Sequence, residues 1–265
     1  MAPTPSDEPA ASPFGDLDIE AIFEPLPLED AFGAVLSEAG AMLEDVRSPL
    51  EAEVWGSDMI AALAGGDLSP AEAMDTLREA LVPTAEEAAT PGALALLRVL
   101  SAIGSTELRA AARGAADGLA ARGVADPEWA AAIGSPDVGE CWCYGDEAGL
   151  GEAVTMSFGY GTKRHAVSVL IDNGVHGGIK DAWVGAAAHV LTRTRALARR
   201  YPKIIFEMID PVDARTRVER AIAAGECPEQ PEEIEDVSAY RALLHARVVL
   251  LPPPSAASAT PDVAT

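Results

Sequence analysis

The sequence predicts an α+β fold: an N-terminal helical unit packed with a three- or four-stranded antiparallel meander, followed by C-terminal helices. Three observations support this class. Apolar residues recur at helical spacing over residues 29–134, change to alternate positions after Ser135, and return to helical spacing from about residue 185. Because the strands are segregated from the helices along the chain, α+β is favoured over a parallel α/β sheet.

The two ends of the chain differ in composition from its middle. Residues 1–28 are acidic and rich in proline, and residues 252–265 are rich in proline, alanine, serine and threonine. Both segments are predicted to be disordered. Within the first, residues 16–24 mix acidic and apolar side chains, which is typical either of a docking peptide for a partner or of an unstructured tail. Between the ends we expect the helical unit over 29–134 and the meander with the C-terminal helices over 135–251.

Helix start signals define the elements of the helical unit. Ser69, Thr90 and Ser105 are each placed as an N-cap, and Glu72 completes a capping box with Ser69. Asp126, followed by a proline, predicts a further short helix over residues 126–133. We expect five or six short antiparallel helices, which pack closely because small residues predominate on their apolar faces.

Four runs of alternating apolar residues follow, at 140–144, 153–158, 166–171 and 179–184. Glycine-containing turns separate these runs, so we expect an antiparallel meander with one face packed on the helical unit. The remaining predicted elements are a helix over 185–201, an edge strand over 203–209, and helices over 210–225 and 237–250.

Composition excludes several functional classes. The formal net charge is −23, from 42 acidic and 19 basic residues, and such a chain repels nucleic acid in bulk. Three cysteines are too few for a disulfide scaffold. Neither a signal peptide nor an apolar run near the ~20 residues of a membrane span is present. We therefore expect a cytosolic protein that contacts no membrane.

Reactive side chains gather on the predicted meander. Cys143, His165 and Asp181 follow one another in the order of thiol hydrolases, in which a histidine and a carboxylate activate a thiolate. This order resembles that of papain-like and transglutaminase-like enzymes. Residues 165–169 with 181–183 resemble the His–Asp strand pair of bacteriocin-processing, C39-like peptidases. That resemblance implies a catalytic role for His165 and Asp181, with Cys143 or Cys141 as nucleophile. The alternative is a strand-edge histidine beside cysteines that serve as small apolar fillers.

Metal binding is a second possibility. Cys141 and Cys143 would face the same side of a strand, and histidines or a third cysteine elsewhere would have to complete the site, the candidates being His165, His176 and Cys227. A carboxylate site is equally conceivable from Asp146, Asp172 and Asp181. Aspartates beside glycines are also ordinary turn residues, and we expect no metal and no cofactor. The nucleotide-loop, nucleophile-elbow, zinc-protease, kinase and EF-hand motifs are absent from the sequence.

Charge is unevenly distributed along the chain. Residues 163–220 carry eleven basic and six acidic residues, whereas the rest carries eight basic and 36 acidic residues. The helix over 185–201 contributes four of these bases, which are Arg193, Arg195, Arg199 and Arg200. A small anionic ligand or an acidic partner would dock there, and Asp146, Asp172 and Trp183 are further candidate binding residues. The alternative is a solvated charged face that pairs with the acidic helical unit or with another copy of the chain.

Four short segments, 144–146, 165–167, 170–172 and 180–184, resemble a group of uncharacterised proteins of high-GC actinobacteria. That family has no assigned activity, so the resemblance implies a source and no mechanism. The leading hypothesis is an accessory or regulatory protein that acts through protein–protein contacts, including self-association. The alternative is a thiol- or metal-dependent hydrolase centred on His165 and Asp181, which requires both residues to converge in a cleft.

Overall fold

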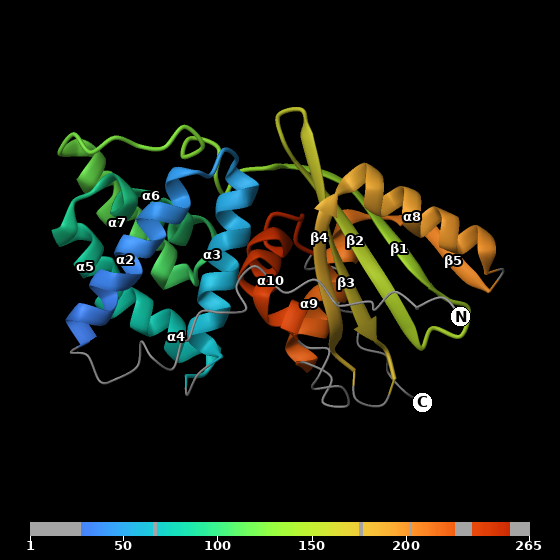
Figure 1. The fold of residues 1–265 in the computed structure, drawn as a ribbon. Coiled ribbons are helices and arrows are strands. Elements are labelled where there is room, and N and C mark those ends of the chain that lie inside the picture. The colour runs from blue at the N-terminus through green and yellow to red at the C-terminus, as the bar shows by residue number, and fades with distance from the viewer. Residues whose placement is uncertain (1–27, 66–67, 175–176, 202, 226–234, 255–265) are drawn as a thin grey trace, which may run out of the picture.

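A computed structural model describes residues 28–65, 68–174, 177–201, 203–225 and 235–254 of the chain (Figure 1). The predicted N-terminal leader up to residue 27, most of the predicted tail, and the candidate ligands His176 and Cys227 lie outside these residues. Within the described part of the chain, no helix has both the length and the apolar composition that a membrane crossing requires.

The N-terminal half of the described chain forms the predicted helical unit. Its elements are α2 (Leu28–Glu44), α3 (Pro49–Ala64), α4 (Pro70–Thr76), a π-helical turn (Leu77–Leu81), α5 (Val82–Ala88), α6 (Pro91–Ile103) and α7 (Thr106–Ala121). The predicted N-caps are present: the side chains of Ser69, Thr90 and Ser105 each accept a hydrogen bond from a backbone N–H in the first turn. Helix α6 is the centre of this unit, because it is buried on nearly all sides.

The helix predicted over residues 126–133 is not formed. The chain makes successive turns there, in which the N–H of Ala130 donates to the carbonyl of Pro127 and the N–H of Ile133 donates to that of Trp129. Gly134 follows with a positive φ of 74°, which ends the segment before a second helical turn can form. Trp129 is still buried in the core of the helical unit.

In the described part of the chain, five strands form one antiparallel sheet, which confirms the predicted α+β class and adds the predicted edge strand to the meander. They are β1 (Asp137–Asp146), β2 (Gly151–Tyr160), β3 (Lys163–Asp172), β4 (Ile179–Ala186) and β5 (Ile204–Ile209). The order across the sheet is β4-β3-β2-β1-β5, so β5 pairs with β1 and lies at one edge.

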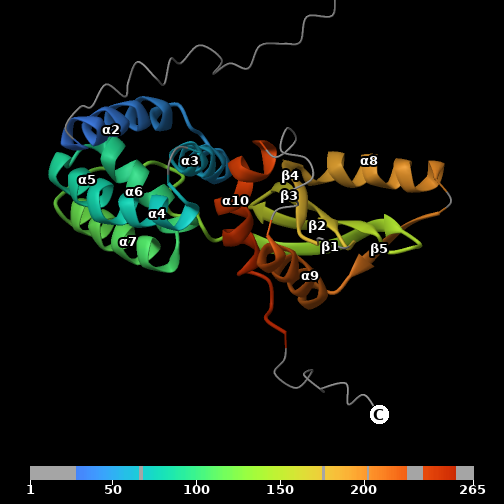
Figure 2. The same cartoon turned by 90° about the horizontal axis from the view of Figure 1, so that it is seen from below.

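The two faces of the sheet are covered by different helices. Helices α9 (Pro211–Ala224) and α10 (Glu235–Val248) cover the inner face, which carries Val154, Val167 and Val169. Helix α8 (Ala187–Arg200) lies across the outer face, where Ala166 packs against Val190 (Figure 2).

Helix α10 joins the two halves of the molecule. Leu243 and Ala246 belong to the core of the helical unit, whereas Leu244 and Val248 belong to the core under the sheet. We expected one face of the meander to pack directly on the helical unit. Instead, α10 lies between α3 and the sheet, so most of the contact between the two halves passes through α10 (Figure 1). The sequence could not show this, because α10 is the last described helix and follows all five strands.

Candidate functional site

The residues of the predicted hydrolase site do not converge. His165 on β3 lies opposite Ala186 of β4, and Asp181 of β4 lies opposite Leu170 of β3. Because successive strand residues point to opposite faces, His165 points to the inner face and Asp181 to the outer face. The sheet itself separates the two side chains.

Cys143 shares the inner face with His165 but lies far from it. Their partners on the intervening strand β2 are Val154 for Cys143 and Phe158 for His165. Four strand positions correspond to about 13 Å along the sheet, with one whole strand between the two residues. The thiol–imidazole–carboxylate arrangement that the hydrolase hypothesis requires is therefore absent from these described residues.

Cys143 has a different set of neighbours. Its Sγ lies 3.2 Å from Oε2 of Glu152, a carboxylate that is ion-paired with Arg217 of α9. Burial of the thiol and its hydrogen bond to this carboxylate raise the pKa of Cys143 to about 12. A reactive cysteine needs a lowered pKa, so Cys143 acts here as a protonated hydrogen-bond donor.

We expect Cys143 to resist alkylation in the native protein. A thiol with a pKa near 12 has a thiolate fraction about a thousandfold below that of an unperturbed cysteine at neutral pH. Iodoacetamide treatment at pH 7.5, followed by peptide mass spectrometry, measures its labelling rate in the folded chain and in urea. Equal rates in the two states would contradict this assignment of the thiol.

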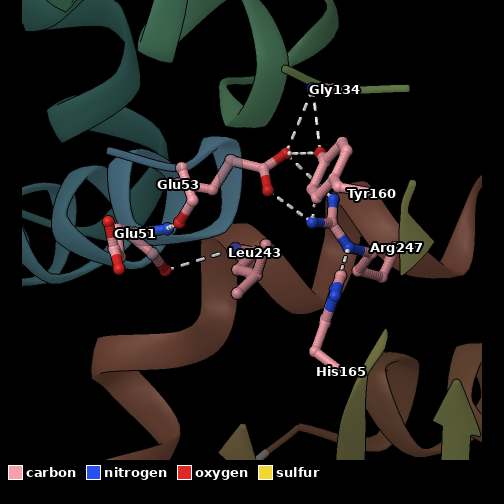
Figure 3. A network of polar contacts seen from close by, with 9 residues as sticks. Glu51, Glu53, Gly134, Tyr160, His165, Leu243 and Arg247 are labelled. Atoms are coloured by element: carbon pink, nitrogen blue, oxygen red, sulfur yellow. Dashed lines mark hydrogen bonds and ion pairs between the residues drawn. The ribbon is translucent and has the colours of Figure 1, made fainter. Parts of the chain in front are cut away.

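His165 belongs to a buried polar network that links α3, β2, β3 and α10 (Figure 3). The Arg247 guanidinium donates two hydrogen bonds to the Glu53 carboxylate, at 3.1 Å and 2.5 Å, and both side chains are fully buried. Its Nε donates to Nε2 of His165 at 3.3 Å. The Tyr160 hydroxyl donates to Glu53 at 2.7 Å and accepts the backbone N–H of Gly134 at 3.2 Å.

The surroundings of His165 and Tyr160 determine their protonation. Burial and the charge of Arg247 lower the pKa of His165 to about 4, so the imidazole is neutral and its Nε2 accepts a hydrogen bond from Arg247. Burial and the Glu53 carboxylate raise the pKa of Tyr160, so its hydroxyl remains a donor. The arginine also lies 5.5 Å from the centroid of the Phe158 ring. The network joins three parts of the fold through hydrogen bonds, with Glu53, His165 and Arg247 buried and Tyr160 half-buried.

Sequence reasoning missed Glu53 and Arg247. One signal was present: Arg247 falls at the helical spacing of Leu243, Leu244 and Val248, which is a core position. A charge on an apolar stripe indicates a buried ion pair, but it does not indicate the partner.

Asp146 and Asp172 act as turn residues, whereas Asp181 lies within β4, is half-buried and has contacts within the fold. Asp146 accepts the backbone N–H of Leu150 at 3.4 Å. Asp172 accepts the N–H of Gly174 at 3.1 Å and lies 3.6 Å from the Lys180 ammonium. Among the described residues, no group of three or more His, Cys, Asp or Glu side chains is placed to hold a metal.

The predicted arginines of α8 are exposed above the outer face of the sheet. Trp142 of β1 stacks on Phe206 of β5 with ring centroids 4.9 Å apart, and the Arg195 guanidinium lies 4.9 Å from the Trp142 ring. Arg199 and these three side chains line an open surface pocket, the hollow, of about 400 Å³. Trp183 is half-buried on the same face and does not line this hollow.

Beside this hollow, β5 forms an edge of the sheet and exposes two large apolar side chains. Ile205 is 47 % exposed and Met208 is 61 % exposed. The arginines of α8 and the edge of β5 together form what we call the contact surface. Comparison of the chain with protein-family models, with curated proteins and with solved structures found no match.

Proposed function

We propose that the protein is a cytosolic accessory protein that acts by binding another protein at the contact surface. The observation that carries this proposal is the open edge of β5: no described strand pairs with the side of β5 that faces away from β1. Such an edge presents unpaired backbone N–H and C=O groups, to which an extended segment of a partner adds as a further strand.

The side chains of β5 favour strand addition. Natural proteins usually block an open edge with proline, lysine or a bulge. The strand Ile204–Ile209 contains no proline and one charged residue, Glu207, and no bulge interrupts its pairing with β1. Ile205 points to the inner face, where an added strand would gain apolar contact, and Met208 points to the outer face beside α8.

Charge favours an acidic occupant of this edge. Arg195, Arg199 and Arg200 lie on the exposed side of α8, and Lys203 precedes β5. An extended segment in which acidic and apolar residues alternate would turn its carboxylates toward α8 and its apolar side chains toward the inner face. The partner that fits best is therefore an acidic segment in extended conformation.

Peptide binding tests this proposal. A short peptide of alternating aspartate and valine should bind the full chain in isothermal titration calorimetry, whereas a peptide of alternating lysine and valine should not. Replacing Ile205 and Met208 together with lysine should weaken binding by about tenfold or more, because it blocks the edge. Replacing Arg195 and Arg199 with glutamate should weaken it similarly and reduce its dependence on salt.

A matched control exists on the helical unit. Replacing Arg109 and Arg113 of α7 with glutamate makes the same charge change away from the contact surface and should leave binding unchanged. Equal binding of the two peptides, or wild-type affinity of the Ile205→Lys, Met208→Lys variant, would overturn the proposal.

A further inference from the structure

A second candidate site lies on the helical side of α10, where residues of α3, α4, α6 and α10 line a cavity. The cavity there has a volume of about 360 Å³, within the range of small-molecule sites. Its wall is mainly apolar, with Ile60, Ala64, Met74, Ile103 and Ala242 among the lining residues. None of the described residues that line it is acidic.

Two nitrogen-bearing side chains of α10 line the same cavity. Arg241 and His245 are four residues apart, so they project from one side of the helix. Arg241 is half-buried and His245 is exposed at the side of the helix. Desolvation lowers the pKa of Arg241, and desolvation together with the charge of Arg241 lowers the pKa of His245. A cationic group in apolar surroundings is stabilised when an anion binds beside it.

We propose that this cavity binds a small amphipathic carboxylate, such as a medium-chain fatty acid. The alkyl chain fills the space between α3, α4 and α6, and the carboxylate accepts hydrogen bonds from Arg241 and His245. Arg241 already has contacts within the fold, and its guanidinium carries five N–H donors, enough to hold a carboxylate as well. This inference is independent of the contact surface.

Calorimetry with decanoate tests the assignment. Decanoate should bind the full chain, whereas decanol, which lacks the charge, and acetate, which lacks the chain, should bind at least about tenfold more weakly. Arg241→Met should weaken decanoate binding by about tenfold or more, and Arg241→Lys, which keeps the charge, should retain more of it. Ala64→Phe, which fills the cavity, should abolish it.

Two controls separate loss of the site from loss of the fold. Arg113→Met removes an exposed arginine that does not line this cavity and should bind as wild type, and thermal melting should show that each variant is folded. Bound decanoate should also shift the NMR resonances of the His245 imidazole. Absence of binding, equal binding of decanol and decanoate, or wild-type affinity of Arg241→Met would each overturn the inference.

Discussion

Replacing Arg247 with methionine is expected to lower the free energy of unfolding by about 3–5 kcal/mol, because it leaves the Glu53 carboxylate buried without its counter-charge. The substitution also removes the hydrogen bond to His165. Folded domains are typically stable by only about 5–15 kcal/mol, so the loss is a large fraction of the total. Urea unfolding followed by circular dichroism measures the effect.

Two further variants show whether the unpaired charge is the cause. Adding Glu53→Gln to Arg247→Met should recover part of the lost stability, because glutamine is neutral and still accepts hydrogen bonds from Tyr160 and Gly134. Arg47→Met removes a largely exposed arginine from an ion pair with Asp45 and should cost below about 1 kcal/mol. If the double variant is less stable than Arg247→Met alone, the buried charge does not explain the loss.

The size of this effect has a structural reason. Glu53 comes from the helical unit, Tyr160 and His165 from the sheet, and Arg247 from the helix that packs against both. Breaking the ion pair therefore weakens the junction between two hydrophobic cores as well as one contact. We expect the two halves to unfold together in the wild type, since α10 contributes to both cores.

Local signals in the sequence predicted much of the local structure, although the helix expected over residues 126–133 is not formed. The capping box of Ser69 and Glu72 is present with both of its hydrogen bonds. The alternation of Cys141, Trp142 and Cys143 correctly predicts a strand in which both cysteines are buried. In both cases the determining contacts lie within a few residues along the chain.

The candidate site could not be predicted in the same way. The order Cys143, His165, Asp181 along the chain says nothing about which face each residue takes, because one position of strand register reverses the face. Glu53 and Arg247 are separated by 194 positions, and no local pattern relates them. The open edge of β5 likewise depends on its pairing with β1, from which three other strands and α8 separate it along the chain.

The buried histidine is expected to make the stability of the fold sensitive to acid. The pKa of His165 is about 4 in the folded chain, against 6.5 for an unperturbed histidine. Between these values the unfolded chain binds more protons than the folded one, so stability falls as the pH is lowered from about 6.5 to about 4. Lowering the pH from 7.5 to 4.5 is expected to reduce the free energy of unfolding by about 2–3 kcal/mol through this histidine alone. Urea unfolding at the two pH values measures the change.

The variant His165→Gln isolates this contribution. Glutamine also accepts a hydrogen bond from Arg247 but does not titrate, so the variant should lose about 2–3 kcal/mol less than the wild type over the same pH range. Other titrating groups, including His245, act in both proteins and cancel in the difference. His189→Gln, which removes an exposed histidine of α8, should keep the acid sensitivity of the wild type. If the free energy of unfolding depends on pH in the same way in wild type and His165→Gln, the imidazole takes up a proton inside the fold. The assignment of His165 as a neutral hydrogen-bond acceptor would then be wrong.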